Sequence, residues 1–292
     1  MNARTVVVGI DGSEQALDAA RWGALEAVRR RAALRLVVAV DWPRGGIMGD
    51  IGINYQAVFV DTARDQAAAA GAAVREAVPG VEVEEQVVIG FPVPVLRSES
   101  RRAELVVLAS RGLGGVAGLL IGSTAVGLAS QAACPVVVVR GPEDGEVPGL
   151  TADDARPVVV GIDGSPLSEA ATAFAFEAAA ARHTGLVAVH AWSDGLVDPT
   201  LAPLIDWSEL ENEESEVLAE RLAGWSARYP DVPVERVTRR DRPAHALLEQ
   251  AEKAQLVVVG SRGRGSVAGL FLGSVGHTLL HRSPCPVAIV RR

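Results

Sequence analysis

The two halves of this chain repeat one another, and this repeat limits the possible folds more than any other feature of the sequence. Residues 9–13 (Gly-Ile-Asp-Gly-Ser) return half a chain later as residues 161–165. Three further pairs match in the same way: 105–112 with 256–263, 120–123 with 271–274, and 134–136 with 285–287. Matches this far apart indicate one domain present twice, rather than a stack of short repeats. The length of 292 residues suits two domains of about 100–150 residues each.

The segment between the two copies has the composition of a linker. Residues 142–156 are rich in acidic side chains, proline and glycine and contain few large apolar side chains. Such a segment connects domains more often than it joins a core. We therefore expect a first domain over residues 1–141, a linker over 142–156 and a second domain over 157–292.

Apolar runs alternate with helical segments within each copy. Residues 6–10 form an unbroken apolar run, which is typical of a strand buried on both faces. Further strands of the first copy are expected at 36–40, 81–89, 105–109 and 136–139, with helices at 13–32, 56–78, about 93–102 and after residue 122. Strands that alternate with helices indicate right-handed crossovers and a mostly parallel sheet. The predicted fold class is therefore α/β, with two tandem doubly wound parallel-sheet domains.

Charge and cysteine content argue against several kinds of protein. The net charge is −8 and no basic patch stands out, so nucleic acid is not an expected partner. Two cysteines do not form a disulfide framework, and we expect reduced, buried thiols in a cytoplasmic protein. Residues 112–139 carry no charge, but they contain six glycines as well as polar side chains. They are better interpreted as loop, helix and strand than as a membrane span.

A glycine-rich segment in the second copy carries the chemistry. Gly260, Gly263 and Gly273 follow a predicted buried strand, and Ser274 begins a predicted helix. Glycines allow backbone N–H groups to turn toward a ligand and allow phosphate oxygens to approach closely. The start of a helix adds further N–H donors and a partial positive charge. The segment is therefore suited to a polyphosphate.

Other nucleotide and metal motifs fit the sequence poorly. A P-loop needs a lysine on the phosphates, but Lys253, the only lysine, precedes the strand. Residues 263–268 match a dinucleotide pattern, yet they follow the fourth strand, and no acidic residue occurs from 261 to 292. His277 and His281 are four residues apart, as in zinc-binding helices, but no third ligand is evident.

On these residues the chain resembles tandem universal stress proteins of mycobacteria and related bacteria. The resemblance rests on the spacing Gly-x2-Gly-x9-Gly-Ser/Thr after the fourth strand, on Asp-Gly-Ser after the first, and on Cys-Pro before the last. The stretch from His190 to Ser193 is also similar. The resemblance implies strand order 3-2-1-4-5 in each domain, a Rossmann-like sheet of the adenine nucleotide alpha hydrolase type. It further implies a nucleotide-dependent regulatory protein of the stress response, with up to two ATP sites per chain.

The resemblance also assigns roles to individual residues. In the second domain Asp163 would face the nucleoside, and Ala191 would contact adenine through its backbone. Ribose and phosphates, with Mg²⁺ as the expected counter-ion, would be held by Gly260, Gly263, Gly273, Ser274 and Val275. The matching first-domain positions are Asp11, Val40, Ala109, Gly112, Gly122, Ser123 and Thr124. Gly9 and Gly161 would lie beside the two pockets.

Several alternatives remain open at this stage. Ala109 replaces the first glycine, and its methyl group would either crowd the ribose or be harmless at an ordinary negative φ. Asp11 and Asp163 could instead anchor a turn. No general base or arginine finger is evident, so hydrolysis would be slow at most. An enzyme on the related adenine-binding fold, or an interaction module without nucleotide, is the alternative function.

The last strand of each copy is a predicted sheet edge, and edges are usually covered or paired. In the family this strand pairs with its equivalent in another domain. We therefore expect a pseudo-dimer within the chain and a homodimer of chains.

Overall fold

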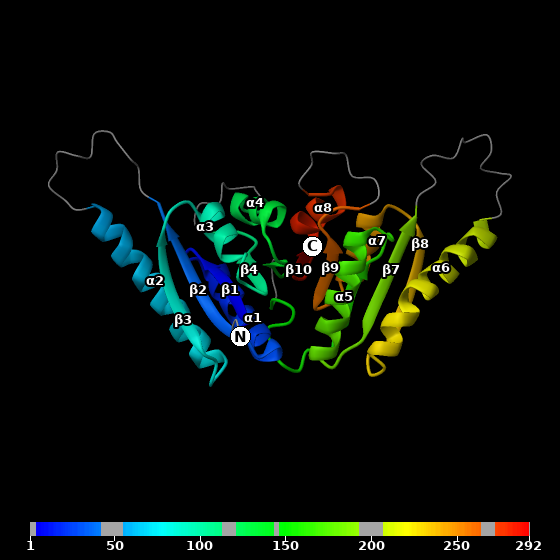
Figure 1. Cartoon of the computed structure of the whole chain (residues 1–292), viewed down its shortest axis with the longest axis horizontal. Helices are drawn as coiled ribbons and strands as arrows, with labels where there is room; N and C mark the ends of the chain where they lie inside the picture. Colours follow the sequence, from blue (N-terminus) through cyan, green and yellow to red (C-terminus); the bar gives the residue numbers. More distant parts are fainter. Residues whose placement is uncertain are drawn as a thin grey trace. The chain divides into compact units, whose positions relative to one another are not determined.

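The computed structural model describes residues 4–41, 55–112, 121–142, 146–192, 207–263 and 272–291. The chain divides into two compact units, Met1–Val139 and Arg140–Arg292, which are described separately below. Figure 1 labels most of the helices and strands of both units. Each unit is a single sheet covered by helices, as the alternation of apolar runs and helical segments predicted.

The first unit contains five parallel strands in the order β3-β2-β1-β4-β5. The strands are β1 (Thr5–Ile10), β2 (Ala33–Val40), β3 (Val83–Ile89), β4 (Leu105–Ala109) and β5 (Val136–Val139). The helices are α1 (Glu14–Arg30), α2 (Tyr55–Ala77), α3 (Pro92–Glu99) and α4 (Ser123–Gln131). Helix α1 packs beside α2 and α3 beside α4. Right-handed crossovers place these two pairs on opposite faces of the sheet.

The second unit has the same topology, with its strands in the order β8-β7-β6-β9-β10. The strands are β6 (Val158–Gly161), β7 (Leu186–Trp192), β8 (Val234–Arg240), β9 (Leu256–Gly260) and β10 (Val287–Val290). The helices are α5 (Pro166–Ala181), α6 (Trp207–Arg228), α7 (Pro243–Ala251) and α8 (Ser274–Arg282). Both units therefore have the strand order 3-2-1-4-5.

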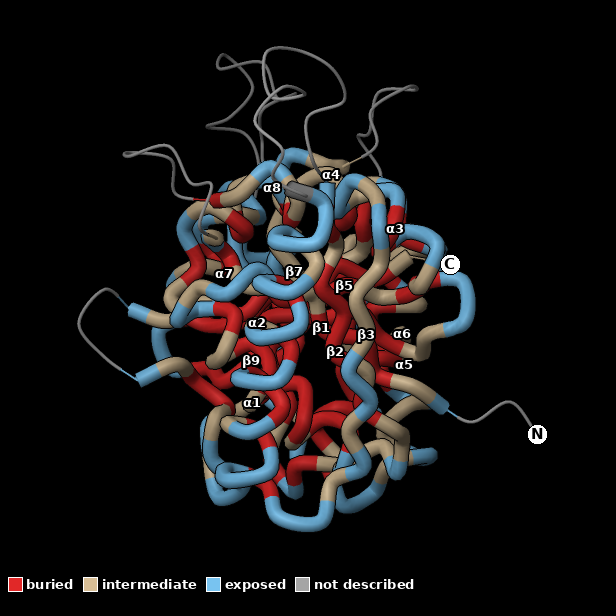
Figure 2. Tube along the Cα trace, turned by 90° about the vertical axis from the view of Figure 1, so that its left-hand side faces the viewer, coloured by how far each residue is buried: buried red, intermediate tan, exposed pale blue. Residues whose placement is uncertain are grey.

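The central strands form the core of each unit, shown in red in Figure 2. All residues of β5 and β10 are buried, and β4 and β9 are buried up to their last residue. Valine dominates these strands because a branched side chain packs well on a pleated surface that is covered on both faces. None of the described helices is both long and apolar enough to cross a membrane.

The residues that precede β6 are fixed to the second unit. Gln255, which is buried, donates from Nε2 to the carbonyl oxygens of Asp154 (2.8 Å) and Arg156 (2.6 Å). The Thr184 hydroxyl donates to the carbonyl oxygens of Ala155 and Arg156, both at 3.0 Å. The end of the predicted linker is thus hydrogen-bonded to the domain that follows it.

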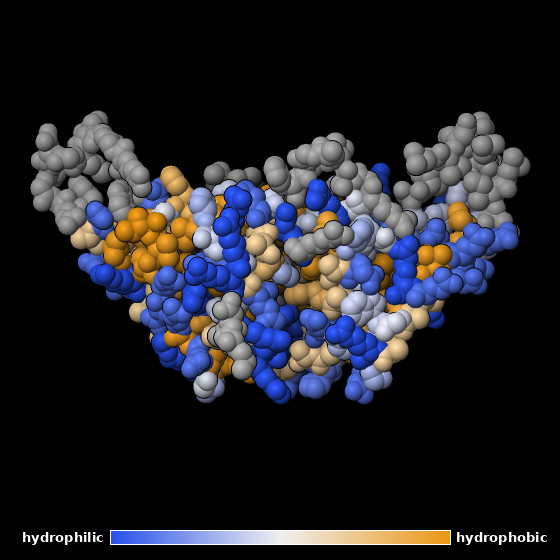
Figure 3. Space-filling model, in the orientation of Figure 1, coloured by the Kyte–Doolittle hydropathy of each residue, from blue (hydrophilic) through white to orange (hydrophobic). Residues whose placement is uncertain are grey.

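The two units differ most at the outer strand and the long helix beside it. In the first unit Val58, Phe59, Ile89 and Phe91 are exposed, and apolar side chains gather over α2 and β3 in Figure 3. In the second unit the strand β8 ends in Arg239 and Arg240. The guanidinium of Arg240 lies 3.6 Å from the centre of the Trp207 ring, which stacks on Trp192. The same topology therefore carries an apolar surface in one unit and a cationic, aromatic one in the other.

Candidate functional site

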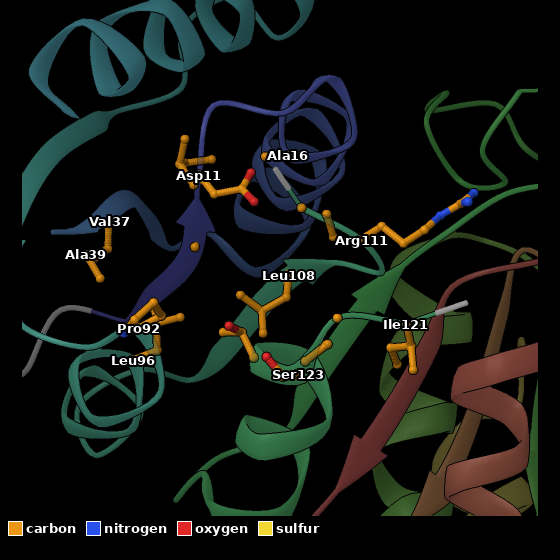
Figure 4. A pocket seen from close by; sticks show the side chains of 17 residues that line it. Asp11, Ala16, Val37, Ala39, Pro92, Leu96, Leu108, Arg111, Ile121 and Ser123 are labelled. Carbon is orange, nitrogen blue, oxygen red and sulfur yellow. The ribbon is translucent and has the colours of Figure 1, made fainter. Parts of the chain in front are cut away.

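A cavity of about 500 Å³ lies in the first unit where the carboxyl ends of β1 and β4 meet (Figure 4). In a doubly wound sheet this is the point where the crossovers diverge and where ligands bind. Seven of the residues predicted for the first-domain site line the cavity: Gly9, Asp11, Ala109, Gly112, Gly122, Ser123 and Thr124.

The carboxylate of Asp11 both anchors a turn and lines the cavity. Its Oδ1 atom accepts hydrogen bonds from the backbone N–H (3.1 Å) and the hydroxyl (2.7 Å) of Ser13. Its Oδ2 atom lies against the Cα of Gly112, where any other residue would place a Cβ atom. Of the two roles considered for this aspartate, the structure shows the turn, and it places the same carboxylate on the cavity wall.

The second unit repeats this arrangement. Asp163 Oδ1 accepts from the N–H of Ser165 at 2.9 Å, and its carboxylate lies against the Cα of Gly263. The Asp163 N–H donates to the Ser168 hydroxyl at 3.1 Å, which adds a further tie to helix α5. The glycine loop and the first strand are therefore held together in the same way in both units.

A single hydrogen bond closes the base of each glycine loop. The N–H of Gly122 donates to the carbonyl oxygen of Ser110 at 2.7 Å, and the N–H of Gly273 donates to that of Ser261 at 2.8 Å. Residues 113–120 and 264–271 of the predicted loops lie outside the described residues. The two ends of each loop are thus fixed next to the start of the following helix.

Helices α4 and α8 begin without the side-chain caps found on α1 and α5. Ser13 and Ser165 accept hydrogen bonds from the first turns of α1 and α5. Gly122 and Gly273 occupy the same cap position on α4 and α8, and no side chain of the described residues caps either helix. Because the first N–H groups of a helix need acceptors, an anion can take this place. In the first unit Ser123 and Thr124 bring these groups to the cavity, and Ser274 and Val275 begin α8 in the same way.

The glycines at this site differ in what they make room for. A Cβ atom at Gly9 would lie 2.5 Å from a methyl carbon of Leu108, and one at Gly161 would lie 3.0 Å from a methyl carbon of Leu247. These two glycines make room for side chains beside the site. At Gly122 and Gly273 the φ angle is −73°, and an added Cβ would come no closer than 3.6 and 3.5 Å to the atoms that the structure describes beyond the neighbouring residues. The described part of the fold therefore has room for alanine at both positions.

The alanine that replaces the first glycine of the motif fits without strain. Among the described residues other than glycine, only Arg31 and His183 have a positive φ, so Ala109 has an ordinary backbone. A Cβ at its counterpart Gly260 would point at the backbone of Leu167 in α5, with carbon and oxygen atoms 3.0 Å away. By analogy, the Ala109 methyl group is directed toward the start of α1.

The assignment of Val40 as the counterpart of Ala191 is wrong by one residue. Gly9 pairs with Val37, and its equivalent Gly161 pairs with Val189, so the position that matches Ala191 is Ala39. Ala39 lines the cavity, whereas the carbonyl oxygen of Val40 points to the other side and accepts from Gly90 N–H at 2.8 Å. The offset of the first repeat, extended to the second strand, leads to Ala39.

Further cavity residues come from helices and were not predicted from the sequence. Ala16 of α1 and Pro92 and Leu96 of α3 form apolar walls. The available signal was Pro92, since proline at the first position of a helix marks a helix that starts directly after a strand.

Arginines bring positive charge to the site in both units. Arg111 lines the first cavity. In the second unit Arg262 follows β9 and Arg291 follows β10, at the ends of two paired strands. Burial lowers the pKa of Arg291, and the nearby positive charge of Arg262 lowers it further. An anion bound at this end of the sheet would oppose both effects, because a nearby negative charge favours the charged form of the guanidinium.

Comparison with known proteins agrees with this fold. The family model for universal stress proteins matches residues 2–140 and 155–291. "Universal stress protein Rv2005c" of Mycobacterium tuberculosis is 43% identical, over 98% of this chain and 97% of its own. A crystal structure of a universal stress protein from Archaeoglobus fulgidus covers 100% of both chains, with 21% identity and a TM-score of 0.71. A universal stress protein solved in complex with cAMP covers 48% of this chain and 99% of its own, with 25% identity and a TM-score of 0.38. The chain therefore belongs to the universal stress protein family and contains two tandem domains of that family.

Proposed function

We propose that this protein is a nucleotide-dependent regulator whose two domains each bind one ATP. The observation that carries the proposal is the first-unit cavity, which joins an aspartate, a closed glycine loop and an uncapped helix start at the switch point of the sheet. The second unit has the same aspartate–glycine contact, the same loop closure and the same uncapped helix. The repetition of all three features supports two sites per chain.

The base would lie against the ends of β2 and β7. Successive residues of a strand direct their backbone groups to opposite neighbours, and Trp192 directs its carbonyl oxygen toward the β8 side, where it accepts from Asp241 N–H at 3.0 Å. Ala191 therefore directs its N–H and C=O toward the side of β6, beyond the last residue of that strand. An N–H donor beside a C=O acceptor matches the N1 and N6 atoms of adenine. Ala39 has the same register position in the first unit, where the strand pairing continues one residue further, to Ile10 with Val38.

The phosphates would lie at the starts of α4 and α8. Backbone N–H groups there, together with Arg111 and Arg262, would balance part of the phosphate charge. The described residues contain no group of three or more His, Cys, Asp or Glu side chains that could hold a metal ion. Mg²⁺ would therefore be bound mainly by the phosphates, with Ser123 and Ser274 hydroxyls nearby, as is usual for this ion.

Regulation by binding suits this site better than rapid catalysis. The Oδ1 atoms of Asp11 and Asp163 already accept hydrogen bonds within their turns, which makes them poor candidates for a general base. We propose that any hydrolysis of ATP is slow. Partners would instead distinguish the ATP-bound protein from the ATP-free protein. Assembly into a homodimer is part of the same proposal.

The test counts the nucleotide bound per chain. The purified protein is denatured, and the released adenine nucleotide is quantified by chromatography beside two variants, Gly122→Ala and Gly273→Ala. Since the fold has room for both methyl groups, each variant should remain folded by circular dichroism. Each should lose the nucleotide of its own domain, because the added methyl group would crowd phosphates bound at the start of the helix in the proposed arrangement.

Close to two ATP per parent chain and one per variant is the expected result. One ATP per parent chain that only Gly273→Ala removes would restrict the site to the second domain. No nucleotide in the parent, and no uptake of added ATP with Mg²⁺, would exclude ATP binding and favour an interaction module.

A further inference from the structure

His190 joins three elements at the base-binding edge of the second unit. It lies in β7 directly before Ala191, and its side chain is 12% exposed. Its Nδ1 atom is 2.7 Å from the carbonyl oxygen of Ile162, which follows β6 and directly precedes Asp163. Its Nε2 atom is 2.9 Å from Oε2 of Glu214 on α6. Because the carbonyl oxygen can only accept, the ring donates from Nδ1.

The bond from His190 to Ile162 lies at the end of the backbone hydrogen-bond ladder between β6 and β7. The ladder ends with the N–H of Ile162 donating to the carbonyl oxygen of Val189 at 2.9 Å. The next acceptor in register is the Ile162 carbonyl oxygen, and the next donor on β7 that faces this side is the N–H of Ala191. His190 occupies that acceptor with its ring. The Ala191 N–H is thereby left to face the site.

The first unit has no histidine at the position that corresponds to His190, so it shows the equivalent strand without this side-chain hydrogen bond. The bond from Val81 N–H to the Val78 carbonyl oxygen at the end of α2 matches the bond from Val232 to Tyr229 at the end of α6, so the two helices correspond with an offset of 151 residues. In this register Glu214 matches Ala63, which is buried, and from the strand pairing His190 matches Val38. A polar pair in the second unit thus replaces an apolar pair in the first. Valine is compatible with this fold at the position of His190.

We propose that His190 is a positioning residue that ends the β6–β7 ladder and so presents the Ala191 amide to the base, giving the second site its preference for adenine over guanine. This inference rests on the proposed function, since it assigns the base selectivity of the same site. Adenine offers an acceptor at N1 and a donor at N6, whereas guanine offers a donor at N1 and an acceptor at O6. A fixed N–H and C=O pair therefore accepts adenine and rejects guanine. If the Ala191 N–H turns to Ile162, this discrimination is lost.

The test uses full-length protein that carries Gly122→Ala, so that only the second site is expected to remain. Equilibrium dialysis gives the Kd for ATP and for GTP in this parent and after adding His190→Val, His190→Asn or His245→Gln. Asparagine keeps a donor near the place of Nδ1 and loses the bond to Glu214. His245 is the matched control, because it also lies next to a carboxylate, that of Asp241, but on the exposed surface of the same unit.

His190→Val should weaken ATP binding up to about tenfold, the factor that corresponds to one neutral hydrogen bond, and should lower the ATP-to-GTP preference by a similar factor. His190→Asn should retain most of both, and His245→Gln should change neither. A purely structural role would weaken both nucleotides equally and leave the preference unchanged, which would overturn the inference.

Two further outcomes distinguish a failure of this inference from a failure of the proposed function. A parent that binds ATP, combined with a His190→Val variant that keeps the same Kd and preference, overturns the inference alone. A parent that binds no ATP overturns the proposed function and the inference together. If His190→Val does not fold, the same Kd measurements are made on Glu214→Ala. This variant should lose less ATP affinity than His190→Val and should change the ATP-to-GTP preference in the same direction.

Discussion

The carboxylate of Asp163 lies directly against the Cα of Gly263, on the side where any other residue would carry its Cβ atom. Asp11 and Gly112 repeat this contact in the first unit. The aspartate that follows the first strand and the glycine that follows the fourth are therefore fitted to each other, and each limits what can stand at the other position.

Gly263→Ala should displace the Asp163 carboxylate and weaken nucleotide binding in the second domain at least about tenfold, because small displacements in a positioned site have large effects. Equilibrium dialysis with ATP measures this loss. Gly224→Ala in α6 is the matched control, since a Cβ there would meet no atom within 4 Å. That change should leave binding unaffected and stabilise the helix by up to about 1 kcal/mol. Unchanged ATP affinity in Gly263→Ala would contradict the importance of this contact.

Ala109→Gly should change ATP affinity in the first domain by less than about twofold, because Ala109 has an ordinary backbone and its methyl group, by analogy with Gly260, is directed toward the start of α1. Removing it should lower the free energy of unfolding by about 0.5–1 kcal/mol, the usual cost of glycine within a strand. Titration calorimetry and urea unfolding measure the two effects.

The reverse change, Gly260→Ala, provides the comparison. Its methyl group would press on the Leu167 backbone at 3.0 Å and should cost about 1–3 kcal/mol of stability. A clear gain of ATP affinity in Ala109→Gly would show that the methyl group crowds the ligand after all.

Glu26 is the buried centre of an ion-pair network at the end of α1. Its side chain is 1% exposed and accepts from Arg30, which also lies 3.2 Å from Glu104. Burial alone would lower the pKa of Arg30, but the two carboxylates outweigh it and raise this pKa. Glu26→Ala should therefore destabilise the first domain by about 3–5 kcal/mol, because it leaves a buried guanidinium poorly compensated.

Urea unfolding followed by circular dichroism checks this prediction. The control is Glu177→Ala in α5, where the glutamate is exposed and the effect should stay within about 0.5 kcal/mol. Equal effects of the two substitutions would mean that the network contributes little.

Asp154 should make the second domain sensitive to acid. Burial raises the pKa of this carboxyl, but hydrogen bonds from Arg156 and from the N–H of Gly149 outweigh it and lower the pKa in the folded state. A carboxyl with a lowered folded pKa stabilises the fold above its unfolded pKa of about 3.9, and this contribution disappears as the pH falls through the folded value. Asp154→Asn should remove this part of the pH dependence below about pH 4. Thermal unfolding of both proteins between about pH 3 and pH 7 should then give stability curves that differ most at the upper end, where the ionised carboxylate contributes fully.

The two cysteines should be unreactive in the folded protein. Burial raises the pKa of both Cys134 and Cys285 to about 12, so neither forms thiolate at neutral pH. Ellman's reagent should label no thiol in the native state and two after denaturation. Rapid labelling of one native thiol would reveal local opening near the corresponding last strand.

Much of the fold follows from the duplicated sequence, because unbroken apolar runs such as residues 6–10 have few alternatives to a buried parallel strand. The strand order followed from the family resemblance and agrees with the structure. The residues of the candidate site that belong to the spaced glycine motif were predictable from the sequence. The sequence could not reveal the fit between Asp163 and Gly263, since residues a hundred positions apart are brought together only when β6 and β9 pair in the sheet.

Other parts of the site depend on packing that leaves no local pattern. Leu96 has the same periodicity as any core residue of a short helix, so its place on the cavity wall was not evident. The Val40 assignment failed because the second half of β2, residues 36–40, is uniformly apolar, and a shift of one residue along such a run changes no pattern. The bond between His190 and Glu214 depends on how α6 lies beside β7, which composition does not determine.

The hydrogen bonds from Gly122 to Ser110 and from Gly273 to Ser261 have a consequence for how such proteins diversify. Each bond joins the two described ends of a glycine loop through backbone atoms. Segments of other lengths or sequences could therefore be exchanged between these anchors while the helix start and its N–H groups stay in place. Duplication then supplies two such insertion points in one chain, so one copy can acquire a new recognition loop while the other keeps the ancestral one.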